Sequence, residues 1–237
     1  MEKTERGAWG SMEALEKKLD YVFRDRSLLS EALNHSSYAN EHRGDGGSSN
    51  ERLEFLGDAI LGFVTAEHLF KTYPNLPEGD LTRIRAALVC EQSLYEVARR
   101  LELGPCLKLG RGEEAGGGRQ RQSILADAVE AIFAAIYLDS DMATISRIIH
   151  RLLLDHSSVH VVEERRDYKT ALQELVQREE GRTLVYELLS ETGPDHNKTF
   201  TFRVLVNGIP EGEGSGHSKK EAEQSAARDA LHKLEQK

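Results

Sequence analysis

Apolar residues recur every three or four positions along most of the first 155 residues, a spacing that places them on one face of an α-helix. The pattern breaks at a glycine- and serine-rich stretch that ends at Asn50, and again at Pro74 and Pro77. Between the breaks the sequence predicts helices over residues 12–19, 27–37, 51–73, 78–101 (as one or two helices), 123–139 and 145–154. The chain is therefore expected to begin with an all-α domain.

The periodicity changes after a short charged stretch at residues 156–166, which is predicted to be a linker between that domain, residues 12–155, and a second one. From residue 167 a helical pattern is followed by three segments of strand pattern and a final helix, for which Ser218 is a good N-cap. Asn207 and Gly208 form a strong hairpin signal between the second and third strands. This order predicts a small α+β domain (α-β-β-β-α) over residues 167–237.

The helix that follows Asn50, its predicted N-cap, carries three carboxylates on one face. Glu51, Glu54 and Asp58 share an arc of about 60° on a helical wheel, opposite the apolar side chains. Acids this close repel one another, and a divalent metal ion is the usual compensation. The alternative is a solvated surface whose acids bind nothing.

Two further residues of this helix do not fit an ordinary solvated face. Phe55 projects beside the acids and away from the core side, and an exposed aromatic residue in that position suggests a partner surface. Gly57 costs roughly 1 kcal/mol in a helix interior relative to Ala, which the close approach of another backbone could justify.

The segment at residues 123–139 is apolar on nearly every side, so it is expected to be a buried helix. It nevertheless carries Asp127 and Glu130 one turn apart, and it contains no basic residue to pair with them. Ala131 and Ala134 are small enough to let another helix come close. Buried carboxylates are costly unless they are paired or bind metal. Two such helices together would supply the oxygen ligands that Mg²⁺ prefers.

Other candidates have plainer interpretations. Glu78 begins the next predicted helix, where an acid favours the helix N-terminus in any protein. His35 could be a catalytic base, but a structural histidine near a helix end is the favoured interpretation, because no nucleophile or further histidine clusters with it. Residues 110–122 are predicted to form a mobile, arginine-containing loop that either touches a polyanion or is only solvated.

Composition limits the possible classes of protein. With 39% hydrophobic and 30% charged residues the chain has the balance of a globular protein, and it contains neither the roughly 20-residue apolar run of a membrane span nor an apolar signal-peptide core. These features predict a cytoplasmic protein without a membrane partner. Its two cysteines sit in no metal-ligand spacing and are expected to be reduced thiols. A net charge of −9 requires any nucleic-acid contact to be local.

Lys219 and Lys220 are the strongest local candidates for such a contact. They occupy the first turn of the last helix, where the helix dipole disfavours cations by several tenths of a kcal/mol. A phosphate backbone against the helix end would explain them, and solvated lysines are the alternative. The C-terminal domain holds 10 Lys and Arg against 13 Asp and Glu, so its binding would depend on a focused patch.

Three separated segments carry a resemblance to the bacterial ribonuclease III family. NERLEFLGDAIL resembles the signature helix of that family, EGDLTRIRAALV the segment that follows it, and SILADAVEAIFAAIYLD its second acidic helix. The C-terminal segment is similar to the double-stranded-RNA-binding domain that the family carries in the same order. The resemblance covers nearly the whole chain from about Leu15 onward.

The resemblance implies a role for each matching residue. It makes Glu54, Asp58, Asp127 and Glu130 the metal ligands, with Asp58 and Glu130 as catalytic residues and Glu51 and Glu78 as supporting acids. It places Phe55 in the interface of a homodimer. In the tail it implies minor-groove contacts by Gln173 and His196 and phosphate contacts by Lys198, Lys219 and Lys220.

The implied activity is hydrolysis of double-stranded RNA by two magnesium ions, for which manganese can substitute, with no small-molecule cofactor. The products would carry 5′-phosphate and 3′-hydroxyl ends, and the substrates would include ribosomal RNA precursors, messenger RNAs and other structured transcripts. One alternative is a double-stranded-RNA-binding protein that does not cleave, which would have little use for six acids. Another is a helical metal hydrolase acting on a small phosphorylated molecule, which would leave the tail unexplained.

Overall fold

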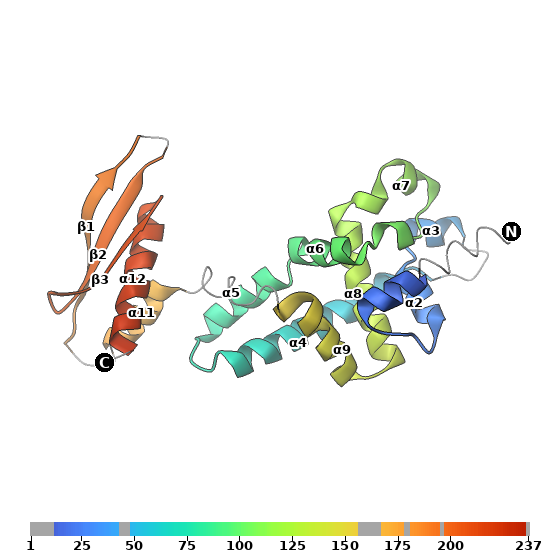
Figure 1. The fold of residues 1–237 in the computed structure, drawn as a ribbon, viewed down its shortest axis with the longest axis horizontal. Helices are drawn as coiled ribbons and strands as arrows, with labels where there is room; N and C mark the ends of the chain where they lie inside the picture. Colours follow the sequence, from blue (N-terminus) through green and yellow to red (C-terminus); the bar gives the residue numbers. More distant parts are fainter. Residues whose placement is uncertain (1–11, 43–47, 156–166, 178–180, 195–196, 236–237) are drawn as a thin grey trace. The chain divides into compact units, whose positions relative to one another are not determined.

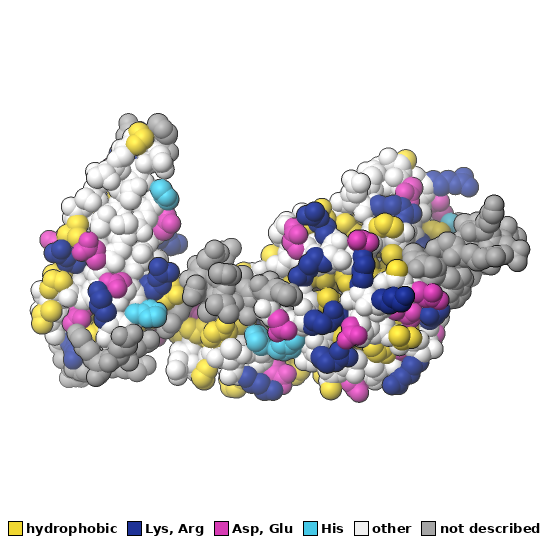
Figure 2. Space-filling view, in the orientation of Figure 1, with side chains coloured by type: hydrophobic (Ala, Val, Ile, Leu, Met, Phe, Trp, Pro, Cys, Tyr) yellow, Lys and Arg dark blue, Asp and Glu magenta, His cyan; other side chains and the backbone are white. Residues whose placement is uncertain are grey.

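The computed structural model of the chain describes residues 12–42, 48–155, 167–177, 181–194 and 197–235. The chain forms two compact units (Figure 1), which divide between residues 165 and 166. Each unit has a hydrophobic core of its own. None of the described helices is long and apolar enough to cross a membrane. On the face shown in Figure 2, Lys and Arg side chains are interspersed with Asp and Glu over both units.

The described part of the first unit is helical. A helix over residues 12–19 is followed by α2 (Arg26–Ala32), α3 (Ser36–Glu41), α4 (Glu51–Thr72), α5 (Glu78–Leu88), α6 (Glu91–Leu101), η2 (Gly104–Cys106), α7 (Arg111–Ala115), η3 (Gly118–Gln120), α8 (Gln122–Asp139), α9 (Met142–Ile149) and the π-helix η4 (His150–Leu154). The predicted all-α architecture is confirmed.

Helix α8 lies at the centre of this unit. It packs against α2, α4, α6 and α9, so its apolar residues are covered on nearly every side. Phe133 is fully buried, and so are five residues around it in the helix: Ala131, Ile132, Ala134, Ala135 and Ile136. The prediction of a buried helix at residues 123–139 is therefore confirmed.

The segment predicted as one helix over residues 27–37 forms two. Helix α2 ends at Ala32, and Asn34 then pairs with Lys108 in a parallel bridge before α3 begins. Asn50 holds the predicted N-cap position of α4, but its side chain does not cap the helix. Its Nδ2 instead donates to the carbonyl oxygen of Ala32 at 3.3 Å, and its N–H donates to that of Asn34 at 2.8 Å. The start of α4 is thereby tied to the segment that follows α2.

The prediction of a mobile loop at residues 110–122 is wrong, because α7 and η3 form there and two of its three arginines are held by the protein itself. Arg119 donates to the carboxylate of Glu114 at 2.7 Å and to the carbonyl oxygens of Gly104 and Leu107 at 2.9 and 2.7 Å. Arg121 pairs with Glu113 at 2.6 Å.

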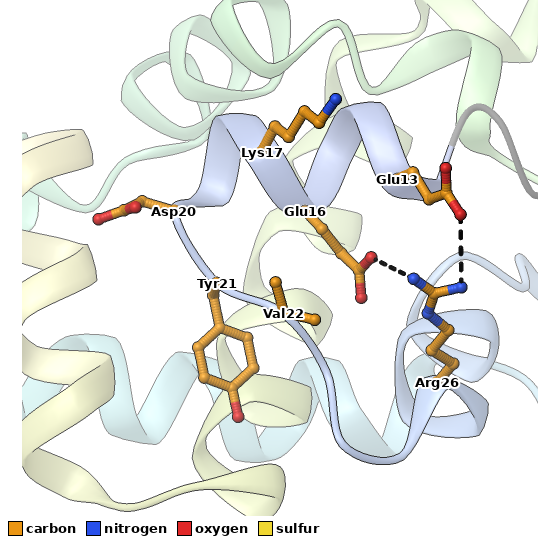
Figure 3. A pocket seen from close by; sticks show the side chains of 7 residues that line it. All are labelled: Glu13, Glu16, Lys17, Asp20, Tyr21, Val22 and Arg26. Atoms are coloured by element: carbon orange, nitrogen blue, oxygen red, sulfur yellow. Dashed lines mark hydrogen bonds and ion pairs between the residues drawn. The ribbon is translucent and has the colours of Figure 1, made fainter.

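The helix at residues 12–19 is joined to the rest of the unit by polar contacts. Figure 3 shows Glu13 and Glu16 directed toward the guanidinium of Arg26, with N–O distances of 3.8 and 2.9 Å, beside an open pocket of about 440 Å³. Nearby, Asp139 at the end of α8 accepts a hydrogen bond from the hydroxyl of Tyr21 at 2.6 Å. These contacts fix the N-terminal segment against α2 and α8.

The second unit has the predicted order α-β-β-β-α. Its elements are α11 (Tyr168–Gln177), β1 (Leu184–Thr192), β2 (Thr199–Val206), β3 (Ile209–Gly216) and α12 (Lys219–Glu235). The strands form an antiparallel sheet in the order β1-β2-β3. Asn207 and Gly208 have φ values of 52° and 76°, as the predicted hairpin turn requires.

Helix α12 packs very closely on β3. A Cβ atom at Gly214 would overlap the backbone of Ala226, and one at Gly212 would overlap the backbone of Ala226 and of Ala230 one turn later. At the start of α12, the predicted N-cap Ser218 accepts a hydrogen bond from the N–H of Glu221 at 3.1 Å. The glycines of β3 thus set how closely α12 approaches the sheet.

Candidate functional site

Helices α4 and α8 touch backbone to backbone at Gly57. A Cβ atom on this residue would overlap the carbonyl group of Glu130, so no other residue fits without moving one helix. The close approach expected at Gly57 is therefore confirmed. It brings the acidic face of α4 directly against the acids of α8.

Three of the predicted ligands meet at this contact. Glu54, Asp127 and Glu130 each offer one carboxylate oxygen, and these oxygens lie within 4.8 Å of one another. All three side chains are half-buried, and within the described ranges no Lys, Arg or His forms an ion pair with any of them. A set of uncompensated oxygen donors of this kind fits a hard divalent cation such as Mg²⁺.

Burial and neighbouring carboxylates raise the pKa values of all three acids of the cluster. Burial and, to a smaller extent, repulsion from Asp58, Asp127 and Glu54 together raise the pKa of Glu130 to about 8. Burial also raises the pKa of Glu54, together with Asp127, Glu51 and Asp58. The cluster thus resists carrying its full negative charge when no cation is bound.

Two groups outside α4 act on Asp127. Its pKa is raised by burial and by Glu91, and lowered by His35. No sequence pattern associates Glu91 with the cluster, since it begins α6 and is far from both acidic helices along the chain. For His35 the sequence pattern favours a structural role alone, and its influence on Asp127 comes from the tertiary fold.

The other predicted acids lie around the three. Asp58 is exposed and acts on Glu54 and Glu130 through its charge, but it is not among the acids whose oxygens converge. Glu51 acts on Glu54 in the same way and accepts a hydrogen bond from Ser49 at 2.7 Å. The structure does not bring Glu78 to the cluster; its side chain accepts a hydrogen bond from Thr82 on α5 at 2.8 Å.

Helix α4 also presents large apolar residues to solvent. Phe55 is 80% exposed, as its position on the wheel predicts, and Phe63 and Phe70 are 56% and 73% exposed. Phe63 and Phe70 line an apolar groove of about 560 Å³ together with Leu81 of α5. Exposed aromatic residues along one helix mark a surface for a partner.

In the second unit two of the predicted RNA-binding lysines, Lys198 and Lys219, lie near the same carboxylate, Glu191. The Nζ atom of Lys198 pairs with Glu191 at 2.8 Å, and Lys198 and Lys219 both lower the pKa of that carboxyl. Lys220 is exposed beside Lys219 in the first turn of α12. Gln173 is exposed on α11, and His196 lies outside the described residues.

Comparison with known proteins identifies both units. Residues 25–157 match a family model described as Ribonuclease-III-like, and residues 168–234 match the double-stranded RNA binding motif. The chain belongs to the ribonuclease III family. The resemblance inferred from the three motifs is thus confirmed, as is the fold class of an all-α endonuclease domain followed by an α+β RNA-binding domain.

Curated relatives of this ribonuclease III family member match it over nearly its full length. Ribonuclease 3 of Desulforamulus reducens is 53% identical over 225 residues, which cover 93% of this chain and 90% of the relative. Ribonuclease 3 of Caldanaerobacter subterraneus subsp. tengcongensis is 50% identical over 223 residues, covering 93% and 96%. A solved nuclease domain of ribonuclease III from Campylobacter jejuni, 40% identical, covers 65% of this chain and 97% of its own, with a TM-score of 0.56. The chain is an endoribonuclease specific for double-stranded RNA.

Proposed function

We propose that the acidic cluster between α4 and α8 is the active site for this cleavage. The proposal rests on one observation: carboxylate oxygens of Glu54, Asp127 and Glu130 lie within 4.8 Å of one another. No described Lys, Arg or His side chain forms an ion pair with them. Asp58 completes the ligand set, and Asp58 and Glu130 are the catalytic residues. The nuclease domain spans residues 12–155 and is linked by residues 156–166 to the RNA-binding domain at residues 167–237.

Magnesium is the proposed cofactor, and manganese can take its place because it accepts the same oxygen ligands. When bound, a pair of such ions supplies an activated water and neutralises charge on the phosphate during hydrolysis. The protein holds the ligands in place through the contact of α4 with α8 at Gly57. Glu51, whose charge acts on Glu54, is proposed as a supporting acid that binds water molecules around the site; Glu78, which the structure does not bring to the cluster, is not.

Lys198, Lys219 and Lys220 are proposed to bind phosphate groups of the RNA, and Gln173 and His196 to contact its minor groove. The exposure of the two lysines at the start of α12 and the grouping of Lys198 with Lys219 support this proposal. A-form RNA has a wide, shallow minor groove, so a domain that reads its shape suits many sequences. Ribosomal RNA precursors, messenger RNAs and other structured transcripts are the proposed substrates.

A homodimer is proposed because α4 exposes Phe55 together with further apolar residues. A two-fold axis would place the same surface of two copies face to face. The Campylobacter jejuni nuclease domain is described as having a region involved in dimer formation, which supports the proposal by similarity. The protein is proposed to act in the cytoplasm, without a membrane partner.

The test is incubation of long double-stranded RNA with the protein in Mg²⁺ and in EDTA, followed by analysis of the product ends. We expect cleavage only with Mg²⁺, to fragments that carry 5′-phosphate and 3′-hydroxyl ends. Binding without cleavage at any Mg²⁺ concentration would instead support the non-cleaving RNA-binding protein. Single-stranded RNA of the same sequence is the control, and it should stay intact.

A further inference from the structure

His35 lies beside the N-terminus of the acidic helix. Its N–H donates to the carbonyl oxygen of Lys108 at 3.1 Å, in the bridge between the segments around residues 34 and 108. The preceding residue, Asn34, accepts a hydrogen bond from the N–H of Asn50 at 2.8 Å, and Asn50 comes directly before α4. These backbone contacts hold His35 close to the helix that carries Glu54.

One edge of the His35 ring has a structural role. Its Nδ1 accepts a hydrogen bond from the N–H of Ser37 at 3.3 Å, which caps the N-terminus of α3, and lies 2.8 Å from the Ser37 hydroxyl. A backbone N–H can only donate, so Nδ1 carries no proton in this contact. The proton of the neutral ring is therefore on Nε2.

The other edge of the ring is available to a ligand. Within the described ranges Nε2 of His35 has no hydrogen-bond partner, and the residue is half-buried rather than enclosed. Several described groups shift the pKa of Glu54, Asp127 or Glu130 through their charge. His35 is the basic one among them, and it lowers the pKa of Asp127. His35 is therefore a neighbour of the acidic cluster, and its Nε2 is free to meet a ligand.

We propose that His35 is a further catalytic residue, whose Nε2–H donates a hydrogen bond to a non-bridging oxygen of the phosphodiester group bound at the acidic cluster. The carboxylates of the cluster can only accept hydrogen bonds or bind cations, and the phosphate oxygens are acceptors as well. A donor is thus the kind of group that the described cluster lacks. No proton is transferred in this contact, which orients the phosphate and stabilises its charge as hydrolysis proceeds. The inference rests on the proposed function of the cluster.

Two substitutions separate the catalytic edge of the ring from the structural one. His35→Asn keeps a short oxygen acceptor that can cap α3, since Asn is among the best N-cap residues, but it cannot reach as far as Nε2. His35→Gln places an amide donor near the position of Nε2 but is a poor N-cap. A purely structural histidine would be replaced better by Asn, and a donor to the substrate better by Gln.

The measurements are single-turnover cleavage of duplex RNA in saturating Mg²⁺, duplex affinity without Mg²⁺, and melting temperature. We expect His35→Asn to keep its affinity and melting temperature but to cleave about 100-fold more slowly, as for the removal of one donor to a developing charge. His35→Gln should melt at a lower temperature yet cleave faster than His35→Asn. Wild-type cleavage by His35→Asn, or activities that follow the melting temperatures, would overturn the proposal.

His42 provides the matched control. Its Nδ1 contacts the carbonyl oxygen of Tyr38 at 2.9 Å and its ring stacks on Tyr38 with centroids 4.1 Å apart, and it is not among the groups that act on Asp127. His42→Asn should cleave at the wild-type rate. Failure of the wild-type protein itself to cleave in Mg²⁺ would contradict the proposed function, whereas the comparison of the two His35 variants tests the role of the ring alone.

Discussion

Burial and three neighbouring carboxylates act together on the side chain of Glu130 and raise its pKa to about 8. In the unfolded chain the same group has a pKa near its ordinary value of 4.5, so folding favours the protonated form. Below about pH 4.5 the group is protonated in both states and costs nothing. As the pH rises toward 8 the unfolded state loses its proton first, and the metal-free folded state becomes less stable by comparison.

Glu130→Gln should remove this part of the pH dependence, because an amide does not ionise. We expect the melting temperature of the metal-free wild-type protein to fall more steeply between about pH 5 and pH 8 than that of Glu130→Gln, measured in EDTA. Added Mg²⁺ should raise the melting temperature of the wild type more than that of the variant, since binding favours the ionised cluster. Parallel melting curves with and without Mg²⁺ would contradict this account of Glu130.

At the scale of elements, the site depends on the contact between α4 and α8. Its central features could be predicted from sequence, because residues one turn apart on a helix share a face. This geometry predicts the acidic faces of both helices and the exposure of Phe55, and it makes Gly57 a candidate for a close helix contact. Contacts between distant segments could not be predicted in this way. The carbonyl groups that hold Arg119 and the bridge that follows α2 come from other parts of the chain, and no local pattern indicates them.

Gly57→Ala tests this contact. The added methyl group would meet the backbone of Glu130 and push the two helices apart, so we expect the variant to be several kcal/mol less stable and to have little cleavage activity. Gly112→Ala in α7 is the control, because a Cβ there meets nothing within 4 Å and the residue lies outside α4. It should leave both stability and cleavage nearly unchanged. Equal behaviour of the two variants in thermal melts and cleavage assays would show that the helices need not touch.

The start of α12 carries two of the lysines that are expected to bind phosphate groups of the RNA. Replacing both Lys219 and Lys220 with Ala should weaken binding to all duplex RNA sequences alike and reduce the slope of log affinity against log salt by about one unit for each phosphate group that is no longer bound. The double variant should still cleave at low salt, because the acidic cluster lies in the other domain. Replacing Arg228 and Lys233 removes the same charge from α12 away from its start and should change the slope less. An unchanged slope in the Lys219 and Lys220 variant would mean that these side chains are only solvated.

At the scale of the whole molecule, the exposed face of α4 predicts the assembly. Phe55→Glu would bury an unpaired charge in a two-fold interface and should convert the dimer to a monomer in sedimentation experiments at micromolar concentration. Val22→Glu is the control, because Val22 is 70% exposed outside α4 and its replacement should leave the dimer intact. A wild-type protein that sediments as a monomer would remove the basis of the prediction.

The central claim is that Glu54, Asp127 and Glu130 bind the metal that cleaves the RNA. Its most direct test is the single-turnover rate of duplex RNA cleavage by the wild type and by Glu130→Gln, measured over a titration of Mg²⁺ from EDTA to millimolar concentrations. The wild-type rate should rise with Mg²⁺ and return to zero in EDTA. Glu130→Gln should bind the duplex normally but cleave it slower by orders of magnitude, because a neutral amide is a much poorer magnesium ligand. Cleavage by Glu130→Gln at nearly the wild-type rate in limiting Mg²⁺ would contradict the account.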